Sequence, residues 1–186
     1  MMKTTKIRMK TKDVAFQFRM GAGFPGDVNR THPASIEPVL NSKTAPLAAF
    51  GQPVLLDASG NARPFTTGDQ SNTVANGYGV AVRPYPFQQS SATNFGQADI
   101  GTATVPAGVV DILREGYIIV AIPAGESPKK GDPVYVWATA SSGGKTQGFF
   151  TSVYSAGNTT QFRKATFNGA PDASGNVEIS IWASNP

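Results

Sequence analysis

Cysteine is absent from this 186-residue chain, which excludes a disulfide framework, a thiolate metal site and a cysteine nucleophile. Histidine occurs once, as His32, and the twelve acidic residues are scattered along the sequence. A protein metal site needs two or more His, Cys or clustered carboxylate ligands. We therefore expect neither a metal ion nor a cofactor.

Catalytic motifs are also lacking. A Ser-His-Asp site needs an imidazole that a third group holds on a rigid scaffold, but His32 lies in a proline-rich stretch and no G-x-S-x-G elbow occurs. The run 143–146, Gly-Gly-Lys-Thr, resembles the end of a phosphate-binding loop, yet Thr139 stands where the first glycine is required. The sequence predicts that this protein is not an enzyme, and a hydrolase using His32 is the least favoured reading.

Long hydrophobic runs are missing as well. No segment approaches the roughly 20 apolar residues of a membrane span. The basic start is not followed by the 7–15 apolar residues of a secretion signal. We expect a protein that is made in the cytosol and has no membrane partner.

Positive charge is scarce outside the first residues. Residues 1–19 hold six Lys or Arg against Asp13 alone, a net charge of +5, whereas the remainder holds ten against eleven acids, a net charge of −1. The high isoelectric point of about 9.4 therefore describes a tail. A basic domain surface for nucleic acid is not predicted. The tail is expected to be solvated, with contact to an acidic partner or to nucleic acid as the alternative.

Glycine and proline are abundant instead. They number 34 of the 186 residues, 20 Gly and 14 Pro, or about 18%, whereas Gly and Pro together make up roughly 12% of an average protein. Both alternate with Val, Ile, Phe and Tyr, a pattern typical of many short strands joined by tight turns. The sequence predicts an all-β fold, a single β-barrel or β-sandwich of jelly-roll or tulip-like form, with two small lobes as the alternative.

Five segments have the pattern of strands. The run YIIVAI within 109–123 is apolar on both faces and should be a buried central strand. The polar stretch 87–108 is expected to be a surface excursion. Residues 141–145 are expected to form a hairpin loop that leads into TQGFFTSVY, residues 146–154. The strand segments are 51–57, 77–85, 109–123, 129–140 and 177–183.

The stretch FPGDVNRTHPASIEPVL, residues 24–40, has the pattern of neither a helix nor a β-strand. Phe24-Pro25-Gly26-Asp27 has the signature of a type II turn, and the later prolines keep the chain extended. We expect an extended N-terminal arm, and we divide the chain into a tail and arm at 1–47 and a β domain at 48–186.

The order of short motifs resembles the capsid cement, or decoration, proteins of tailed bacteriophages. The motifs are F-P-G-D-V-x-R, I-E-P, F-G-x-P-V, G-x-x-V-R-P-Y-P, L-R-x-G-Y-I-x-V, K-G-D-P-V-Y-V and E-I-x-I. They occupy residues 24–30, 36–38, 50–54, 79–86, 113–120, 130–136 and 178–181. Each motif alone consists mostly of residues that are common in turns and strands. Together, in this order, the motifs span nearly the whole domain.

This resemblance implies a structural virion protein, made in the host cytoplasm, that binds the outside of the phage head. Its implied partners are the major capsid protein and itself, as a homotrimer, and its implied role is to lock neighbouring shell subunits against internal DNA pressure. Phe24 and Ile36 are expected to fill apolar grooves, with Arg30 and Glu37 as polar anchors. The full set of expected contact residues is Phe24, Pro25, Asp27, Arg30, Ile36, Glu37, Arg83 and Tyr85.

A carbohydrate-binding or adhesion module of a phage fibre or tail is the alternative. It would use Tyr85, Trp137 or Trp182 as stacking platforms for sugars. Exposure decides between the two readings, because a row of exposed aromatic rings favours sugar binding and buried tryptophans oppose it.

Overall fold

The computed structural model describes residues 22–30, 32–71, 77–84 and 105–182. Within these ranges the strands are β1 (Ser35–Leu40), β2 (Pro53–Leu56), β3 (Ala62–Arg63), β4 (Gly79–Ala81), β5 (Val109–Ala121), β6 (Pro133–Trp137), β7 (Phe149–Thr151), β8 (Thr159–Phe167) and β9 (Asn176–Ile181). A single 3-10 turn, η1 (Asp69–Ser71), precedes β4. No helix in the described part of the chain is long and apolar enough to cross a membrane.

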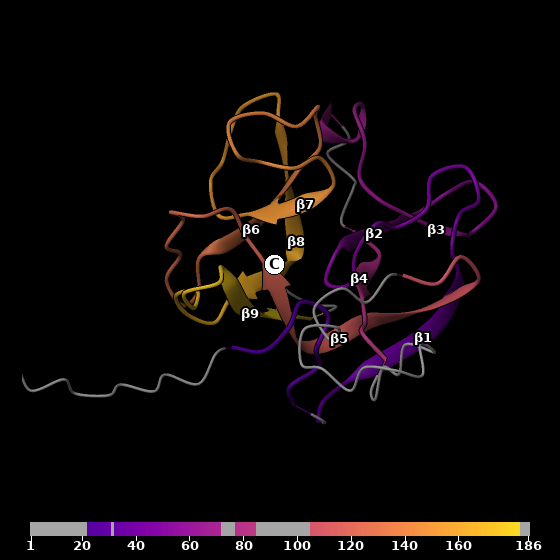
Figure 1. The fold of residues 1–186 in the computed structure, drawn as a ribbon, viewed down its shortest axis with the longest axis horizontal. Helices are drawn as coiled ribbons and strands as arrows, with labels where there is room; N and C mark the ends of the chain where they lie inside the picture. Colours follow the sequence, from indigo (N-terminus) through magenta and orange to yellow (C-terminus); the bar gives the residue numbers. More distant parts are fainter. Residues whose placement is uncertain (1–21, 31, 72–76, 85–104, 183–186) are drawn as a thin grey trace, which may run out of the picture.

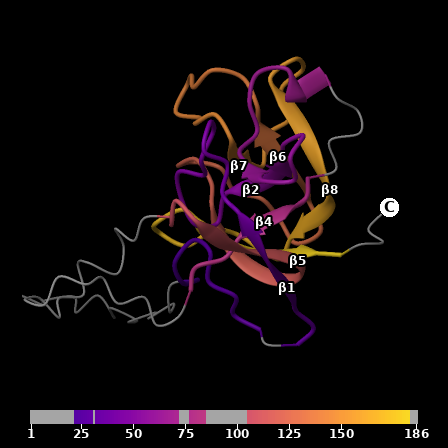
Figure 2. The ribbon, with the colours of Figure 1, turned by 90° about the vertical axis from the view of Figure 1, so that its right-hand side faces the viewer.

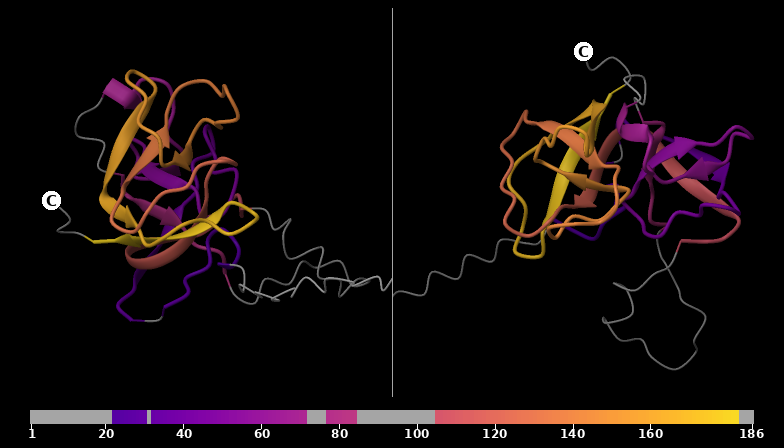
Figure 3. Two further views of the ribbon diagram at one scale, coloured as in Figure 1. Left: turned by 90° about the vertical axis from the view of Figure 1, so that its left-hand side faces the viewer. Right: turned by 90° about the horizontal axis from the view of Figure 1, so that it is seen from above.

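The strands form one curled antiparallel sheet that makes a half-barrel. Its order is β3-β2-β4-β5-β9-β8-β6-β7, and β1 pairs with β5 beside this path. Figure 1 shows β6 to β9 on one side and β1 to β4 on the other, and the view from above in Figure 3 separates the same two groups. The all-β prediction is confirmed.

Strand β5 connects the two groups because it is 13 residues long. Its first half pairs with β1 and β4, and its second half pairs with β9 from Gly116 opposite Ile181 to Ala121 opposite Asn176. Gly116 stands at the change of partner with φ of +132°, and a Cβ there would lie 2.8 Å from the Pro33 carbonyl oxygen. Only glycine fits this close approach of the arm backbone.

Two apolar clusters lie on opposite faces of β4 and β5. The larger one is built around Phe150 and Phe162, whose rings meet edge to face at 5.4 Å. The smaller one contains Ala81 and Ile112. In the second half of β5, Ile118, Ile119 and Val120 are buried in succession, as the sequence predicts for a strand that is covered on both faces.

Most of the expected strands are present. Strands β2, β4, β5 and β6 lie within their predicted segments, β9 begins one residue before its segment, and β7 lies in the stretch 146–154 that follows the predicted hairpin loop. An antiparallel bridge between Ser142 and Lys145 closes that loop. Strand β8 is not anticipated by the sequence reading, although it pairs with both β6 and β9. The expected excursion at 87–108 lies largely outside the described residues.

The described part of the segment before β2 lies on the domain, and part of it is a β-strand, which the sequence pattern of residues 24–40 did not predict. Residues Ser35–Leu40 form β1, which Figure 2 shows beside β5 at the base of the molecule. Because β1 and β5 share one sheet, the two sides of the division at residue 47 are hydrogen-bonded to each other. That division stays a prediction.

Candidate interaction surface

The Phe24-Pro25-Gly26-Asp27 turn is tied into the domain by its backbone. The Asp27 amide donates to the Phe24 carbonyl at 3.0 Å, and Gly26 has φ of +92°, which confirms a tight turn with glycine at its third position. Gly26 donates to the Ile119 carbonyl at 2.8 Å, and the Ile119 amide donates to the Asp27 carbonyl at 2.9 Å. The turn thus continues the sheet on the edge of β5 that faces away from β9.

This anchoring leaves the Phe24 ring at the surface. Phe24 is 40% exposed, and the Arg83 guanidinium lies over its ring at 4.9 Å from the centroid. The Arg83 amide also donates to the Gly26 carbonyl at 2.8 Å. Phe24, Pro25, Asp27 and Arg83 are therefore brought together at one place, and their role as contact residues stays a prediction.

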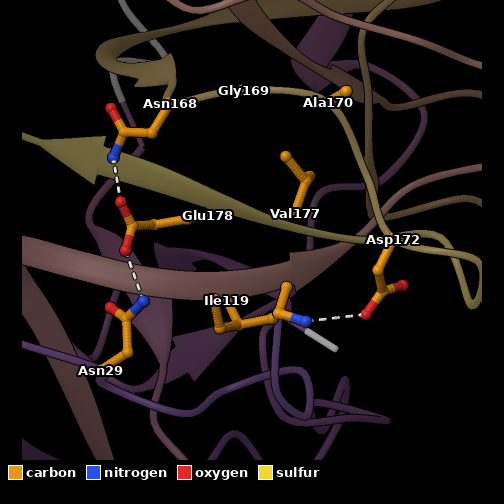
Figure 4. A pocket seen from close by; sticks show the side chains of 9 residues that line it. Asn29, Ile119, Asn168, Gly169, Ala170, Asp172, Val177 and Glu178 are labelled. Atoms are coloured by element: carbon orange, nitrogen blue, oxygen red, sulfur yellow. Dashed lines mark hydrogen bonds between the residues drawn. The ribbon is translucent and has the colours of Figure 1, made fainter. Parts of the chain in front are cut away.

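Arg30 and Asn29 bind the chain's own sheet through Glu178. Arg30 Nη2 lies 2.7 Å from Glu178 Oε1, and the Arg30 guanidinium covers the Tyr117 ring at 4.0 Å. Asn29 Nδ2 donates to Glu178 Oε2, and Asn168 Nδ2 donates to Glu178 Oε1 at 2.7 Å, as Figure 4 shows. The expected polar anchor Arg30 is thus already engaged within the chain.

A second carboxylate fixes the start of the described chain beside the β8–β9 turn. Asp172 accepts a hydrogen bond from the Ala22 amide at 2.9 Å, and Asn176 Nδ2 donates to the Gly23 carbonyl at 2.9 Å. Burial alone would raise the pKa of Asp172, but the backbone amides of Asn176, Ala22 and Ser174 outweigh it and hold that pKa below its usual range.

The hollow between these contacts does not have the chemistry of a metal site. It encloses about 280 Å³ and includes Asp172 and Glu178 in its wall. Both carboxylates accept hydrogen bonds from the chain itself. Among the described residues, no group of three or more His, Cys, Asp or Glu side chains could hold a metal ion.

Glu37 also faces its own chain. It accepts hydrogen bonds from the Tyr78 hydroxyl and from Arg114 Nη1, the latter at 2.6 Å. The Arg114 guanidinium lies over the Tyr78 ring at 3.8 Å. The Tyr78 hydroxyl and then Arg114 lower the pKa of Glu37 from its ordinary value. Sequence reasoning predicted an anchor for another chain, and the structure shows an internal contact.

Three apolar side chains of β1 lie on the face of the strand opposite to Glu37. Ile36 is 46% exposed and Leu40 is 59% exposed, and Leu40 pairs across the strands with Val109, which is 54% exposed. Pro38 is exposed between them. Because side chains alternate along a strand, Ile36, Pro38 and Leu40 share one face, opposite to that of Glu37 and Val39. We call Ile36, Pro38, Leu40 and Val109 the β1 strip.

A second exposed apolar group follows β7. Val153 and Tyr154 are 45% and 65% exposed, and the Tyr154 ring packs against Tyr135 at 5.7 Å. We call these three residues the β7 patch. Sequence reasoning found only Ile36 among the exposed members of the two surfaces, since which face of an edge strand stays uncovered depends on distant segments.

Two of the three aromatic residues of the sugar-binding alternative lie in the described part of the chain, and neither is exposed. Trp137 is buried, and its indole Nε1 donates to the Ala140 carbonyl at 3.1 Å. Trp182 is half-buried and meets the Tyr117 ring edge to face at 5.5 Å. Tyr85 lies outside the described residues. His32 is exposed in an irregular segment, which gives it no catalytic scaffold.

The architecture of this chain also occurs in a solved structure. A solved chain from "The capsid of Myoviridae Phage XM1" has a similar fold, with a TM-score of 0.60 and 17% sequence identity, covering 91% of this chain and 96% of that chain. At this identity the likeness shows the fold alone. The search of curated proteins found no match.

The family match itself comes from the sequence. The model of the XM1 gp53 minor capsid proteins matches residues 14–181, so it covers nearly the whole chain and starts after most of the basic tail. The resemblance to phage capsid-associated proteins is therefore confirmed at the level of the family. The chain belongs to the XM1 gp53 minor capsid protein family.

Proposed function

We propose that the protein is a cement protein on the outer surface of a phage head, where it joins neighbouring major capsid subunits and stabilises the shell against DNA pressure. The observation that carries this proposal is the β1 strip, four exposed apolar residues that lie beside the exposed Asp111 on one face of a hydrogen-bonded strand pair. Membership of a minor capsid protein family supports a structural role in the virion. No cofactor and no enzymatic step belong to this function.

The β1 strip suits contact with a shell for an energetic reason. Isolated exposed apolar residues are ordinary, but neighbouring ones that share a face form a patch of the kind that interfaces bury. Leu40 and Val109 are direct cross-strand partners, so their side chains are ordered before any partner arrives. Ordering in advance reduces the entropy that is lost on binding.

Contacts within the chain hold the arm, and with it the β1 strip, in a fixed position before binding. Arg30 is held by Glu178, and Glu37 is held by Arg114. In the proposed complex Phe24 and Ile36 touch the shell, as the sequence suggests, whereas Arg30 and Glu37 position them from behind. Pro25, Asp27 and Arg83 keep the Phe24 turn in place, and a contact role for Tyr85 stays a prediction.

The β7 patch supports self-association as a homotrimer. A ring of identical subunits needs two different surfaces on each copy, one that meets the next copy and one that meets the previous copy. A trimer would also multiply weak shell contacts, because the second and third attachments become intramolecular. Val153 and Tyr154 are therefore proposed to meet a second copy, leaving the β1 strip for the shell.

Cryo-electron microscopy of complete heads tests the location directly. We expect density for this fold on the outer surface, around local three-fold positions, with the β1 strip facing two neighbouring major capsid subunits. Heads from a phage that lacks the gene serve as the control and should lack this density. Density on the inner surface, or copies bound only at the tail vertex, would contradict the proposal.

A further inference from the structure

Strand β1 buries little apolar surface against the rest of the domain. In the described part of the chain it pairs with β5 alone, and four of its six residues are exposed. Only Val39 packs against an apolar cluster, as a partly buried neighbour of Ile112. An edge strand with so little apolar burial has the features of a segment that opens locally.

The hydrogen-bonding pattern between β1 and β5 shows which β1 amide protons would become exposed to exchange if β1 opened. The Asn41 amide donates to the Gly108 carbonyl at 2.7 Å. In an antiparallel ladder alternate residues face the partner strand, so the Glu37 and Val39 amides also point toward β5. The Ile36 and Leu40 amides point to the free edge, and Pro38 has no amide proton.

The chain on both sides of β1 is fixed much more firmly. Before it, Arg30 is bound by Glu178 and stacked on Tyr117. After it, buried Asn41 donates through Nδ2 to the Pro106 carbonyl at 2.9 Å and accepts the Leu47 amide at 3.0 Å. Opening of β1 would therefore be confined between two anchored points.

Between these anchors, Glu37 is the residue of β1 whose side chain makes polar contacts with the domain. It connects β1 to Arg114 on β5 and to Tyr78 just before β4, and Arg114 covers the Tyr78 ring. A hydrogen bond to a charged group contributes more than a neutral one. The three side chains Glu37, Tyr78 and Arg114 form what we call the Glu37 clasp.

We propose that the Glu37 clasp is a lock that keeps β1 on the sheet, and that β1 opens as a separate unit, without the rest of the domain, when Glu37 loses its charge. The proposal concerns the free chain and stands whether or not the protein binds a shell. An open β1 would displace the strip residues Ile36, Pro38 and Leu40 from their ordered positions.

The direction of the pH dependence follows from the contacts. Tyr78 and Arg114 lower the pKa of Glu37 in the folded chain, so the contribution of the clasp is present above the ordinary glutamate pKa of about 4.3. It is lost as the pH falls through the lower, folded pKa. The other acids of the paired β5 segment are Asp111, opposite Pro38, and Glu115, opposite Ser35.

Hydrogen exchange of the full chain, measured at residue level, tests the lock. We expect the Glu37→Gln substitution to raise exchange at the residue 37 and Val39 amides about tenfold at pH 7, since a charged hydrogen bond is replaced by a weaker neutral one. Amides of the β5–β9 ladder should be unaffected. In the wild-type chain, β1 protection should fall on acidification from pH 5 to pH 3, after correction for intrinsic rates, and should approach that of the variant.

Two further variants keep the interpretation sharp. Asp111→Asn removes a charge from the same strand pair on the opposite face and should leave β1 exchange unchanged. Tyr78→Phe removes one hydrogen bond while keeping the ring under Arg114, and should raise β1 exchange by a few fold. The proposal is overturned if Glu37→Gln exchanges like the wild type, or if β1 and β9 amides accelerate together in either clasp variant.

Discussion

Replacing both Leu40 and Val109 with glutamate is expected to weaken binding to the phage head by about 100-fold or more. The two side chains are exposed cross-strand partners in the β1 strip. In the proposed complex they are buried against the major capsid protein, where two unpaired carboxylates would have to lose water without a partner. Co-sedimentation with heads that lack the protein measures this binding.

The domain fold should survive the double substitution, because neither side chain packs into a core, although two carboxylates directly opposite each other repel and cost a little stability. Circular dichroism and the melting temperature should match those of the wild type within the usual range for surface changes. Lys129→Glu is the matched control: it changes the net charge by the same −2 at an exposed position of the β5–β6 connection, and should bind normally. If the double variant binds heads as well as the wild type does, the β1 strip is not part of the interface.

Substituting Phe162 with alanine is expected to cost about 3–5 kcal/mol of unfolding free energy. Phe162 is fully buried and lies between Phe150, at 5.4 Å and nearly perpendicular, and Phe65, at 6.3 Å. Gly77 approaches so closely that a Cβ there would lie 1.9 Å from the ring. The cavity cannot close without moving two strands and this loop, so the loss should be near the top of the range.

Urea denaturation followed by circular dichroism measures this loss. For a chain of this length the melting temperature should fall by roughly 6–20 °C. Tyr154→Ala, at an exposed aromatic residue, should change stability by less than about 0.5 kcal/mol. If Phe162→Ala lowers the free energy of unfolding by less than about 1 kcal/mol, packing of the aromatic cluster is not a main source of the stability of the core.

The central strand could be predicted because its sequence is unambiguous. Ile118, Ile119 and Val120 are buried in succession, and a strand covered on both faces has no polar position to interrupt it. The turn at Gly26 was equally readable, since Pro followed by Gly fits one turn type. Both features are local, so neighbouring residues suffice to specify them.

Strand β8 could not be read in the same way. Its sequence TTQFRKATF carries two adjacent basic residues that break any alternation of apolar and polar positions. The register of its pairing with β6 also shifts between Pro133 and Tyr135, so extra residues stand on one strand. Such an irregularity changes which face a side chain occupies, and the period-2 signal is lost.

The polar contacts of the arm lay beyond sequence reasoning for another reason. Arg30 meets Glu178 across 148 positions, and Glu37 meets Arg114 across 77. Nothing local identifies such partners. The sequence correctly suggested the turn at Gly26, whereas the fold was needed to show that Arg30 and Glu37 bind inward and that Ile36 and Leu40 stay exposed.

Heating DNA-filled heads with and without the protein tests most directly whether it holds neighbouring capsid subunits together. We expect heads that lack it to release DNA at a lower temperature, and purified wild-type protein to restore the original value. The Leu40 and Val109 double variant should fail to restore it. Equal heat tolerance of complete and protein-free heads would contradict a cementing role.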